Sequence, residues 1–191
     1  MKEILKLGGI LMLITAIAGG ALSMVNSITK PKIELQKRLA LERALLKALP
    51  TADSDAIIPV ETNGQKYYKG YESPDTTGLV GYAFVAKGKG YSSEIETMVG
   101  IDTTGAITGT SILHQVETPG LGTKIEEVTY GEEKPWFQQQ FMDRTWEELK
   151  LDKDGGDINS ITGATISSRA VTSSIREGLK ELENELGGFN N

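Results

Sequence analysis

The chain has 191 residues, a length that suits one domain of ordinary size together with a membrane anchor. It contains no cysteine and one histidine, His114, so thiolate-bound clusters, disulfides, cysteine catalysis and a multi-histidine metal centre are excluded and we expect no metal site. From Lys32 onward, 17 Lys and Arg stand against 25 Asp and Glu, a net charge of -8 that argues against nucleic acid as a partner.

The first feature along the chain is an uncharged stretch of 23 residues between Lys6 and Lys30. A helix over residues 7–28 would be about 33 Å long, which is enough to cross the hydrocarbon core of a bilayer. We therefore expect a transmembrane anchor over residues 1–30. The alternative is a cleaved signal peptide ending near residues 16–18, but the apolar run is long for such a peptide. Basic residues flank both ends, so charge alone leaves the topology open.

Residues 31–50 are expected to form an amphipathic helix that links the anchor to an outer domain over residues 51–191. Pro31 suits the first turn of a helix, and Pro50 ends it. Five leucines between them recur at near-helical spacing: Leu35, Leu39, Leu45, Leu46 and Leu49.

The middle of the outer domain reads as β-strands, because four segments are rich in Val, Ile, Thr and aromatic residues. Residues 102–105 fit a hairpin turn, and residues 88–90 fit another tight connection, so the sheet should be antiparallel. The four predicted strands are Lys66–Tyr71, Val80–Ala86, Glu94–Ile101 and Ala106–Leu113.

Helical patterns return in the last third of the chain. Residues 135–141 and 145–149 predict short helices, and a longer helix should begin near Thr165. One apolar stripe runs along that last helix: Val171, Ile175, Leu179, Leu182 and Leu186. The predicted fold class is α+β, with one N-terminal transmembrane helix and an antiparallel-sheet domain with flanking helices.

The stretch 159–168 has the properties of an anion site, because it lies directly before the last helix. The first N–H groups of a helix have no internal acceptors and the helix dipole favours negative charge there. Gly163 lets the backbone approach a ligand, and four residues add hydroxyl groups: Thr162, Thr165, Ser167 and Ser168. The alternative is an ordinary Ser/Thr helix cap.

The run Thr162-Gly163-Ala164-Thr165, followed by Ile166-Ser167-Ser168, resembles the attachment motif of the FMN-binding domain family. That family includes the G subunit of Rnf complexes and the C subunit of the sodium-pumping NADH:quinone reductase. The resemblance implies that a flavin transferase joins FMN covalently to Thr165 through a phosphoester, with Thr162, Gly163, Ala164 and Ser167 around it. One position departs from the family, which usually has an acidic residue where this chain has Asn159.

A second block, residues 114–122, resembles the Glu-Thr-Pro-Gly-Leu-Gly element of the same family. The resemblance implies that this element packs near the flavin. Glu117 would accept hydrogen bonds from ring N–H groups, Thr118 would donate or accept them, and Leu121 would cover a ring face. Gly120 and Gly122 would keep the loop slim. The alternative is a simple Pro-Gly turn.

Three further residues are weaker candidates, and each has a simpler structural interpretation. Tyr91 could stack on the ring, Arg144 could pair with the phosphate, and His114 could carry a proton. Each also fits an ordinary place in the fold, as a surface-strand tyrosine, an exposed helix-start arginine and a structural histidine at a strand end.

The resemblance implies an electron-transfer subunit of a membrane-bound, ion-translocating ferredoxin:NAD oxidoreductase, without catalytic residues of its own. Its partners would be the other Rnf subunits, including a second flavin-bearing membrane subunit, a flavin transferase and the lipid bilayer. The flavin domain would lie on the extracytoplasmic side of the cell membrane. Two other hypotheses remain open: a tethered assembly or ligand-binding module without flavin, and a freestanding flavin reductase.

Overall fold

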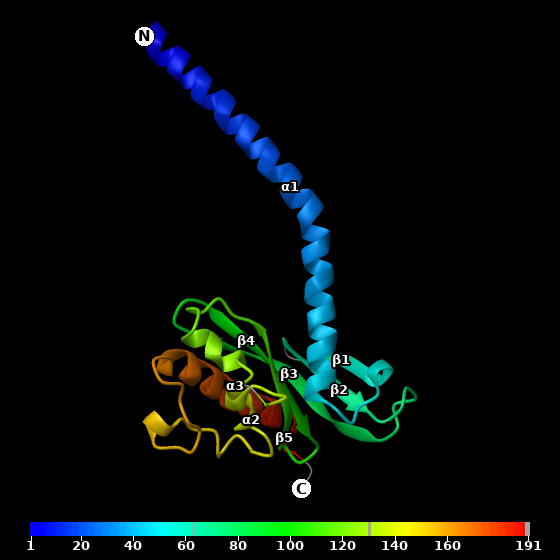
Figure 1. Cartoon of the computed structure of the whole chain (residues 1–191). Coiled ribbons are helices and arrows are strands. Elements are labelled where there is room, and N and C mark those ends of the chain that lie inside the picture. Colours follow the sequence, from blue (N-terminus) through cyan, green and yellow to red (C-terminus); the bar gives the residue numbers. More distant parts are fainter. Residues whose placement is uncertain (63, 130, 190–191) are drawn as a thin grey trace. The chain divides into compact units, whose positions relative to one another are not determined.

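The computed structural model describes residues 1–62, 64–129 and 131–189, and it divides into two units, residues 1–40 and 41–191. The first unit is helical throughout and belongs to α1 (Lys2–Ala48) (Figure 1). Within the described residues, α1 is the one helix long and apolar enough to cross a membrane. Its apolar side chains between residues 4 and 28 are exposed, as a surface facing lipid requires.

The helix does not begin at Pro31, because α1 is continuous through that residue. The prediction that Pro31 occupies the first turn of a separate helix is therefore wrong. A proline at this position removes the N–H that would bond to the carbonyl of Ser27. The helix continues because the bonds on both sides of this single gap remain. The predicted end before Pro50 is confirmed.

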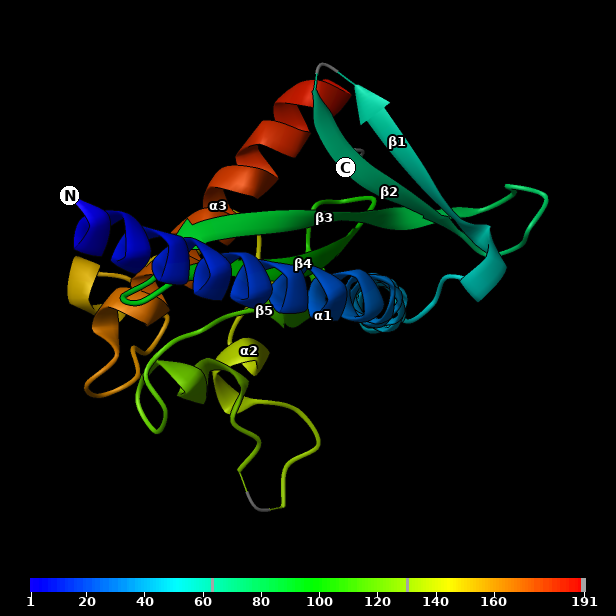
Figure 2. The same ribbon diagram turned by 90° about the horizontal axis from the view of Figure 1, so that it is seen from above.

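The second unit is built on a five-stranded antiparallel sheet, and the predicted fold class is confirmed. The strands follow one another in chain order, and Figure 2 shows the first two turned relative to the others, as sheet twist requires. The strands are β1 (Ile57–Thr62), β2 (Gln65–Tyr71), β3 (Leu79–Lys89), β4 (Glu94–Asp102) and β5 (Ile107–His114).

Four of these strands match the sequence prediction, whereas β1 was missed. β1 contains Pro59, which argues against a strand in general but is tolerated on an edge strand, where one N–H needs no partner. β3 runs further than predicted, to Lys89, so the tight turn after it lies at residues 90–93 and not at residues 88–90. The N–H of Gly90 closes this turn by donating to the carbonyl of Ser93 at 2.8 Å. The hairpin turn at residues 102–105 is confirmed.

One face of the sheet carries the last helix, α3 (Thr165–Leu186), which begins where predicted. Its apolar stripe is the centre of the larger core, with Val171, Ile175 and Leu179 fully buried. The helix lies very close to β3: a Cβ on Gly88 would stand 2.3 Å from the carbonyl oxygen of Ala170. The start of α3 is thereby held against the end of β3.

The other face of the sheet carries the last turns of α1, which belong to this unit from Leu41 onward. Ala44, Leu45, Ala48 and Leu49 are buried there. Glycines in the sheet make this approach possible, since a Cβ on Gly100 would stand 2.1 Å from the carbonyl oxygen of Ala48. That oxygen also accepts a 2.7 Å hydrogen bond from the Thr108 hydroxyl.

The chain between β5 and α3 contains only short elements: η2 (Gly122–Glu126), α2 (Trp136–Gln139) and η3 (Asp152–Asp154), with η1 (Ser54–Ala56) before β1. The predicted helix at residues 135–141 is confirmed in shortened form. The predicted helix at residues 145–149 is wrong, because this segment forms turns. Its Glu148 side chain accepts from the N–H of Thr145 at 2.9 Å, as at a helix start, but the chain does not continue helically.

Candidate functional site

The start of α3 is exposed and carries no side-chain cap within the described residues. The N-cap position is occupied by Ala164, which has no polar side-chain atom. The N–H groups of the first turn therefore point outward without acceptors from their own helix. Thr162 and Gly163 are exposed and Thr165 is half-buried, so this end of the helix offers hydroxyl and N–H donors to an anion.

Two serines of the motif face inward instead. The Ser168 hydroxyl donates to the carbonyl of Ala164 and accepts from the N–H of Ile161, both at 3.0 Å. The Ser167 hydroxyl is buried and donates to Oε2 of Glu117 at 2.5 Å. The side chains of these serines shape the loop before the helix and do not contribute the donor groups to an anion that the sequence suggested.

Glu117 is the central polar group of the site, with 4% of its surface exposed. Its carboxylate accepts from the backbone N–H groups of Tyr91, Ser92 and Ser93 at 2.9 to 3.0 Å, and from the hydroxyls of Ser93 and Ser167. Burial raises the pKa of this carboxyl, but the hydrogen bonds from Ser167, Ser92, Tyr91 and Ser93 outweigh it and lower the pKa to about 2.

The sequence predicts Glu117 as an acceptor for flavin N–H groups. In the structure its oxygens accept hydrogen bonds from donors of the chain itself. Instead, Glu117 joins three segments: the turn after β3, its own loop and the start of α3. Two glycines make room for it, since a Cβ on Gly90 would stand 2.6 Å from Oε1 and a Cβ on Gly122 would stand 2.6 Å from its Cβ.

The loop at residues 117–122, called the Pro-Gly loop below, lies directly against the motif at residues 162–165, as the two sequence blocks suggested. Leu121 Cδ2 is 3.1 Å from where a Cβ on Gly163 would stand, and Ser167 Oγ is 2.8 Å from a Cβ built on Gly122. Gly120 and Gly163 both have positive φ values, +73° and +79°, which favour glycine. Thr118 is exposed, and its carbonyl accepts from the N–H of Leu121 at 3.1 Å.

Exposed apolar side chains surround the start of α3. Leu121 is 44% exposed, Ile166 49% and Tyr91 72%. Ile166 directly follows Thr165, Leu121 touches the motif at Gly163, and Tyr91 is tied to Glu117 through its N–H. Apolar surface beside an anion site suits a ligand with a phosphate at one end and a flat ring at the other.

Of the weaker candidates, Arg144 donates from Nε to the carbonyl of Gln140 at 2.9 Å. His114 ends β5 and is exposed. Gln140 also bonds Asn159: its Oε1 accepts from the Asn159 N–H at 2.7 Å and from Nδ2 at 3.1 Å. The position at which the family usually has an acid is thus occupied here by an amide paired with another amide.

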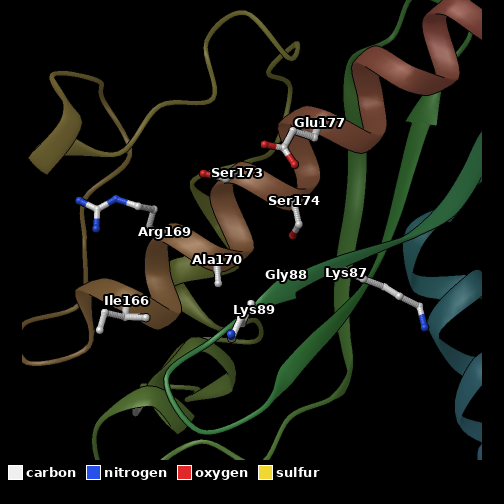
Figure 3. Close-up of a pocket in the computed structure, with 9 residues that line it drawn as sticks. All are labelled: Lys87, Gly88, Lys89, Ile166, Arg169, Ala170, Ser173, Ser174 and Glu177. Atoms are coloured by element: carbon white, nitrogen blue, oxygen red, sulfur yellow. The ribbon is translucent and has the colours of Figure 1, made fainter.

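A groove beside the attachment motif was missed by the sequence reasoning. It has a volume of about 280 Å³ and lies between Lys87–Lys89 at the end of β3 and one flank of α3 that includes Ile166, Arg169 and Ala170 (Figure 3). The signal that could have revealed it is the succession of small residues at helical spacing along α3, Ala170, Ser173 and Ser174. No cluster of three metal-ligating side chains occurs in the part of the chain that the structure describes.

The outward-facing helix start and its apolar neighbours lie within a region that matches a family model, and this match defines the class as an FMN-binding domain. The chain matches the FMN-binding domain family over residues 90–180 and the RnfG N-terminal region over residues 1–47. It is 31% identical to the G subunit of the ion-translocating oxidoreductase complex of Methanosarcina acetivorans, over 97% of this chain and 98% of that protein.

Two more relatives show the same relationship. The G subunit of the Na(+)-translocating ferredoxin:NAD(+) oxidoreductase complex of Acetobacterium woodii is 32% identical, over 96% of this chain and 93% of that protein. The G subunit of the proton-translocating ferredoxin:NAD(+) oxidoreductase complex of Clostridium ljungdahlii is 31% identical, over 90% of this chain and 88% of that protein. Among solved structures, Shewanella oneidensis NqrC aligns with a TM-score of 0.49 and 17% identity over 72% of each chain.

The chain belongs to the family of G subunits of Rnf-type ion-translocating oxidoreductase complexes. This family membership, together with α1, defines a membrane-anchored protein with a single span.

Proposed function

We propose that this protein is the electron-transfer G subunit of a membrane-bound, ion-translocating ferredoxin:NAD oxidoreductase, and that it carries FMN joined by a phosphoester to Oγ1 of Thr165. The named complexes of its relatives support the first part. The observation that carries the second is the contact between the Pro-Gly loop and an uncapped, exposed helix start.

The residues present fit a flavin nucleotide. The phosphate would lie on the N–H groups at the start of α3, next to the Thr162 hydroxyl, where the helix dipole stabilises negative charge. Gly163 carries no Cβ, so the backbone can approach the phosphate, and Ala164 brings no bulk. Leu121 and Ile166 offer apolar surface to the ring.

Each group at the site then has one task. FMN, when bound, supplies the capacity to take up and release electrons. Thr165 holds its phosphate, while Glu117 and Ser167 fix the relative positions of the two loops. No side chain of the chain itself needs to react with a substrate, so the protein acts as a redox carrier within a complex.

The partners follow from this assignment. They are the other subunits of the complex, including a second flavin-bearing membrane subunit, and a flavin transferase that attaches FMN during maturation. We also propose that the domain beyond α1 lies on the extracytoplasmic side of the membrane. Protease added to spheroplasts, which expose the outer side of the cell membrane, should then cleave within residues 51–191, and cleavage only after the spheroplasts are lysed would contradict the orientation.

Intact mass of the purified full chain tests the attachment. Protein made together with the transferase should carry the mass of one FMN, and Thr165→Ala should abolish it while the fold persists. Thr162→Ala is the matched control, because it removes a neighbouring exposed hydroxyl and should lower loading less severely. FMN retained in Thr165→Ala, or a native mass equal to that of the amino acids alone, would refute the assignment.

A further inference from the structure

The segment that leads into the start of α3 is held by a hydrogen bond at every N–H group from residue 158 to residue 161. The N–H of Ile158 donates to the carbonyl of Lys150 at 3.0 Å. The next three N–H groups donate to side chains: Asn159 to Oε1 of Gln140 at 2.7 Å, Ser160 to Oδ1 of Asp152 at 3.1 Å, and Ile161 to Oγ of Ser168 at 3.0 Å. The course of the chain directly before the motif at residues 162–165 is therefore fixed.

Gln140 bonds to the backbone of this segment on both sides. Its Oε1 accepts from the N–H of Asn159 at 2.7 Å, and its Nε2 donates to the carbonyl of Asn159 at 3.2 Å. One side-chain amide thus pairs with both backbone groups of one residue, as a neighbouring strand would. A third bond, from Nδ2 of Asn159 to the same Oε1, measures 3.1 Å. Two of the three bonds do not depend on the side chain at position 159.

The short helix α2, which Gln140 directly follows, is anchored in the core. Phe137 and Phe141 are fully buried, and their rings pack edge to face with centroids 5.3 Å apart. From the same helix, Gln138 donates to the carbonyl of Ile125 at 2.9 Å. Ile125 belongs to η2, which continues from the Pro-Gly loop. The chain around α2 therefore bonds to both segments that form the candidate site.

The path from Asn159 to the proposed attachment residue is short, because Thr165 is six residues further along the chain. The carbonyl of Ile161 accepts from the N–H of Ala164 at 2.9 Å. Ser168, which holds the N–H of Ile161, donates to the carbonyl of Ala164 at 3.0 Å. A displacement of residue 159 would therefore pass through these bonds to the first residue of α3.

Resting on the function proposed above, we propose that Gln140 is a positioning residue for flavin attachment, which holds the chain before the motif so that the Thr165 hydroxyl is presented to the transferase. The donor in this step is a flavin dinucleotide. Oγ1 of Thr165 forms a bond to the phosphorus of its FMN half, the bond from that phosphorus to the bridging oxygen breaks, and AMP leaves with the electron pair. The hydroxyl proton passes to a base of the transferase. A preset segment does not have to be ordered as the reaction occurs.

The test is the rate at which the flavin transferase, supplied with flavin dinucleotide, attaches FMN to the full chain in detergent, followed by intact mass. Gln140→Ala should lower the kcat of attachment by about tenfold, since misplacement of a reacting group by about 1 Å can cost more than that. KM should be unchanged, because the surface that meets the transferase is kept. A mere loss of folded chain would instead raise the apparent KM.

The neighbouring residue Gln139 provides a matched control. Its Nε2 donates to Oε2 of Glu132 at 3.1 Å and to the carbonyl of Lys134 at 2.8 Å, both before α2 in the chain. Gln139→Ala should therefore attach FMN at the native rate. Gln140→Asn keeps the amide but is one methylene too short to reach both backbone groups, so it should lose kcat as Gln140→Ala does.

Asn159→Ala separates positioning from recognition of the side chain at position 159. This variant keeps both backbone bonds to Gln140 and should attach FMN at close to the native rate. A loss as large as that of Gln140→Ala would show that the transferase reads the Asn159 side chain, and would overturn this inference.

The remaining outcomes separate this inference from the proposed function. A native rate in Gln140→Ala and Gln140→Asn, or a loss that appears only in the apparent KM, would overturn the positioning role and leave attachment at Thr165 in place. A native chain that gains no FMN would overturn both.

Discussion

The hydroxyl of Ser167 donates to Oε2 of Glu117 at 2.5 Å, across fifty residues of sequence. This bond connects the first turn of α3 to the loop that follows β5, and the same carboxylate also holds the turn after β3 through three backbone N–H groups. One buried negative charge thus determines how three segments of the candidate site lie relative to one another.

Replacing Glu117 by Gln should destabilise the outer domain, because an amide brings an NH2 group to a place where every neighbour is a donor. The expected loss is about 2–3 kcal/mol, the usual effect of removing charged hydrogen bonds and leaving buried donors unpaired. Urea denaturation of the full chain in detergent measures it. Ser167→Ala removes a single donor and should cost about 1 kcal/mol. Equal stability of Glu117→Gln and the native protein would show that the carboxylate has no structural role.

The stability of the domain should fall in acid between about pH 4.5 and pH 2. The pKa of Glu117 is lowered from 4.5 to about 2 in the folded state, so its contribution is complete above 4.5 and disappears as the folded carboxylate becomes protonated. The size of this contribution is about 3 kcal/mol. Asp152 and Asp154 also have lowered pKa values and act in the same direction. The comparison of native protein with Glu117→Gln isolates the effect of Glu117: the variant should lose stability less steeply over this range, and parallel curves would contradict the assignment.

Gly88→Ala should be far more damaging than Gly163→Ala. A methyl group at Gly88 meets the Ala170 carbonyl oxygen at 2.3 Å, so α3 or β3 must move. At Gly163 the methyl group meets only Leu121 Cδ2 at 3.1 Å, and the cost is that of a positive φ, about 1–2 kcal/mol. Thermal denaturation ranks the two, with Gly120→Ala as a control for φ strain in open space. A ranking in which Gly163→Ala is the worse would argue against the close packing of α3 on β3.

The bidentate pair of Arg169 with Asp154 should contribute little to stability despite two bonds of 2.8 Å. Both side chains are more than one third exposed, and such pairs contribute about 0–1 kcal/mol. Asp154→Asn should therefore shift the denaturation midpoint slightly, and the shift should vanish in high salt because exposed charges are screened. A large loss that persists in high salt would indicate that the pair holds the loop at residues 152–160 in place.

Local sequence patterns were sufficient to predict the helices and strands that bury one face. The stripe of α3 follows from its helical periodicity, and strands β2 to β5 follow from their content of Val, Ile, Thr and aromatic residues together with the turns between them. β1 was missed because an edge strand tolerates Pro59, a residue that usually excludes a strand. The helix predicted at residues 145–149 does not form, although Glu148 accepts from the N–H of Thr145 as a residue in the first turn of a helix would.

The site shows a similar division. The two family blocks suggested that Leu121 and the motif with Gly163 lie together, and the structure places Leu121 next to Gly163. The partners of Glu117 could not be foreseen, because they are backbone N–H groups of the turn between β3 and β4, whose direction is set only after the two strands have paired.

The last turns of α1 limit where the chain can be truncated to give a soluble domain. They bury four residues against the sheet: Ala44, Leu45, Ala48 and Leu49. A version that begins at Pro50 would expose Tyr68 and Met98 to water, because the helical turns that cover them are missing. An exposed apolar patch of this kind promotes aggregation. A version that starts between residue 31 and Leu41 lacks the apolar span but keeps the helical turns that cover the sheet, and it should purify as a monodisperse species without detergent.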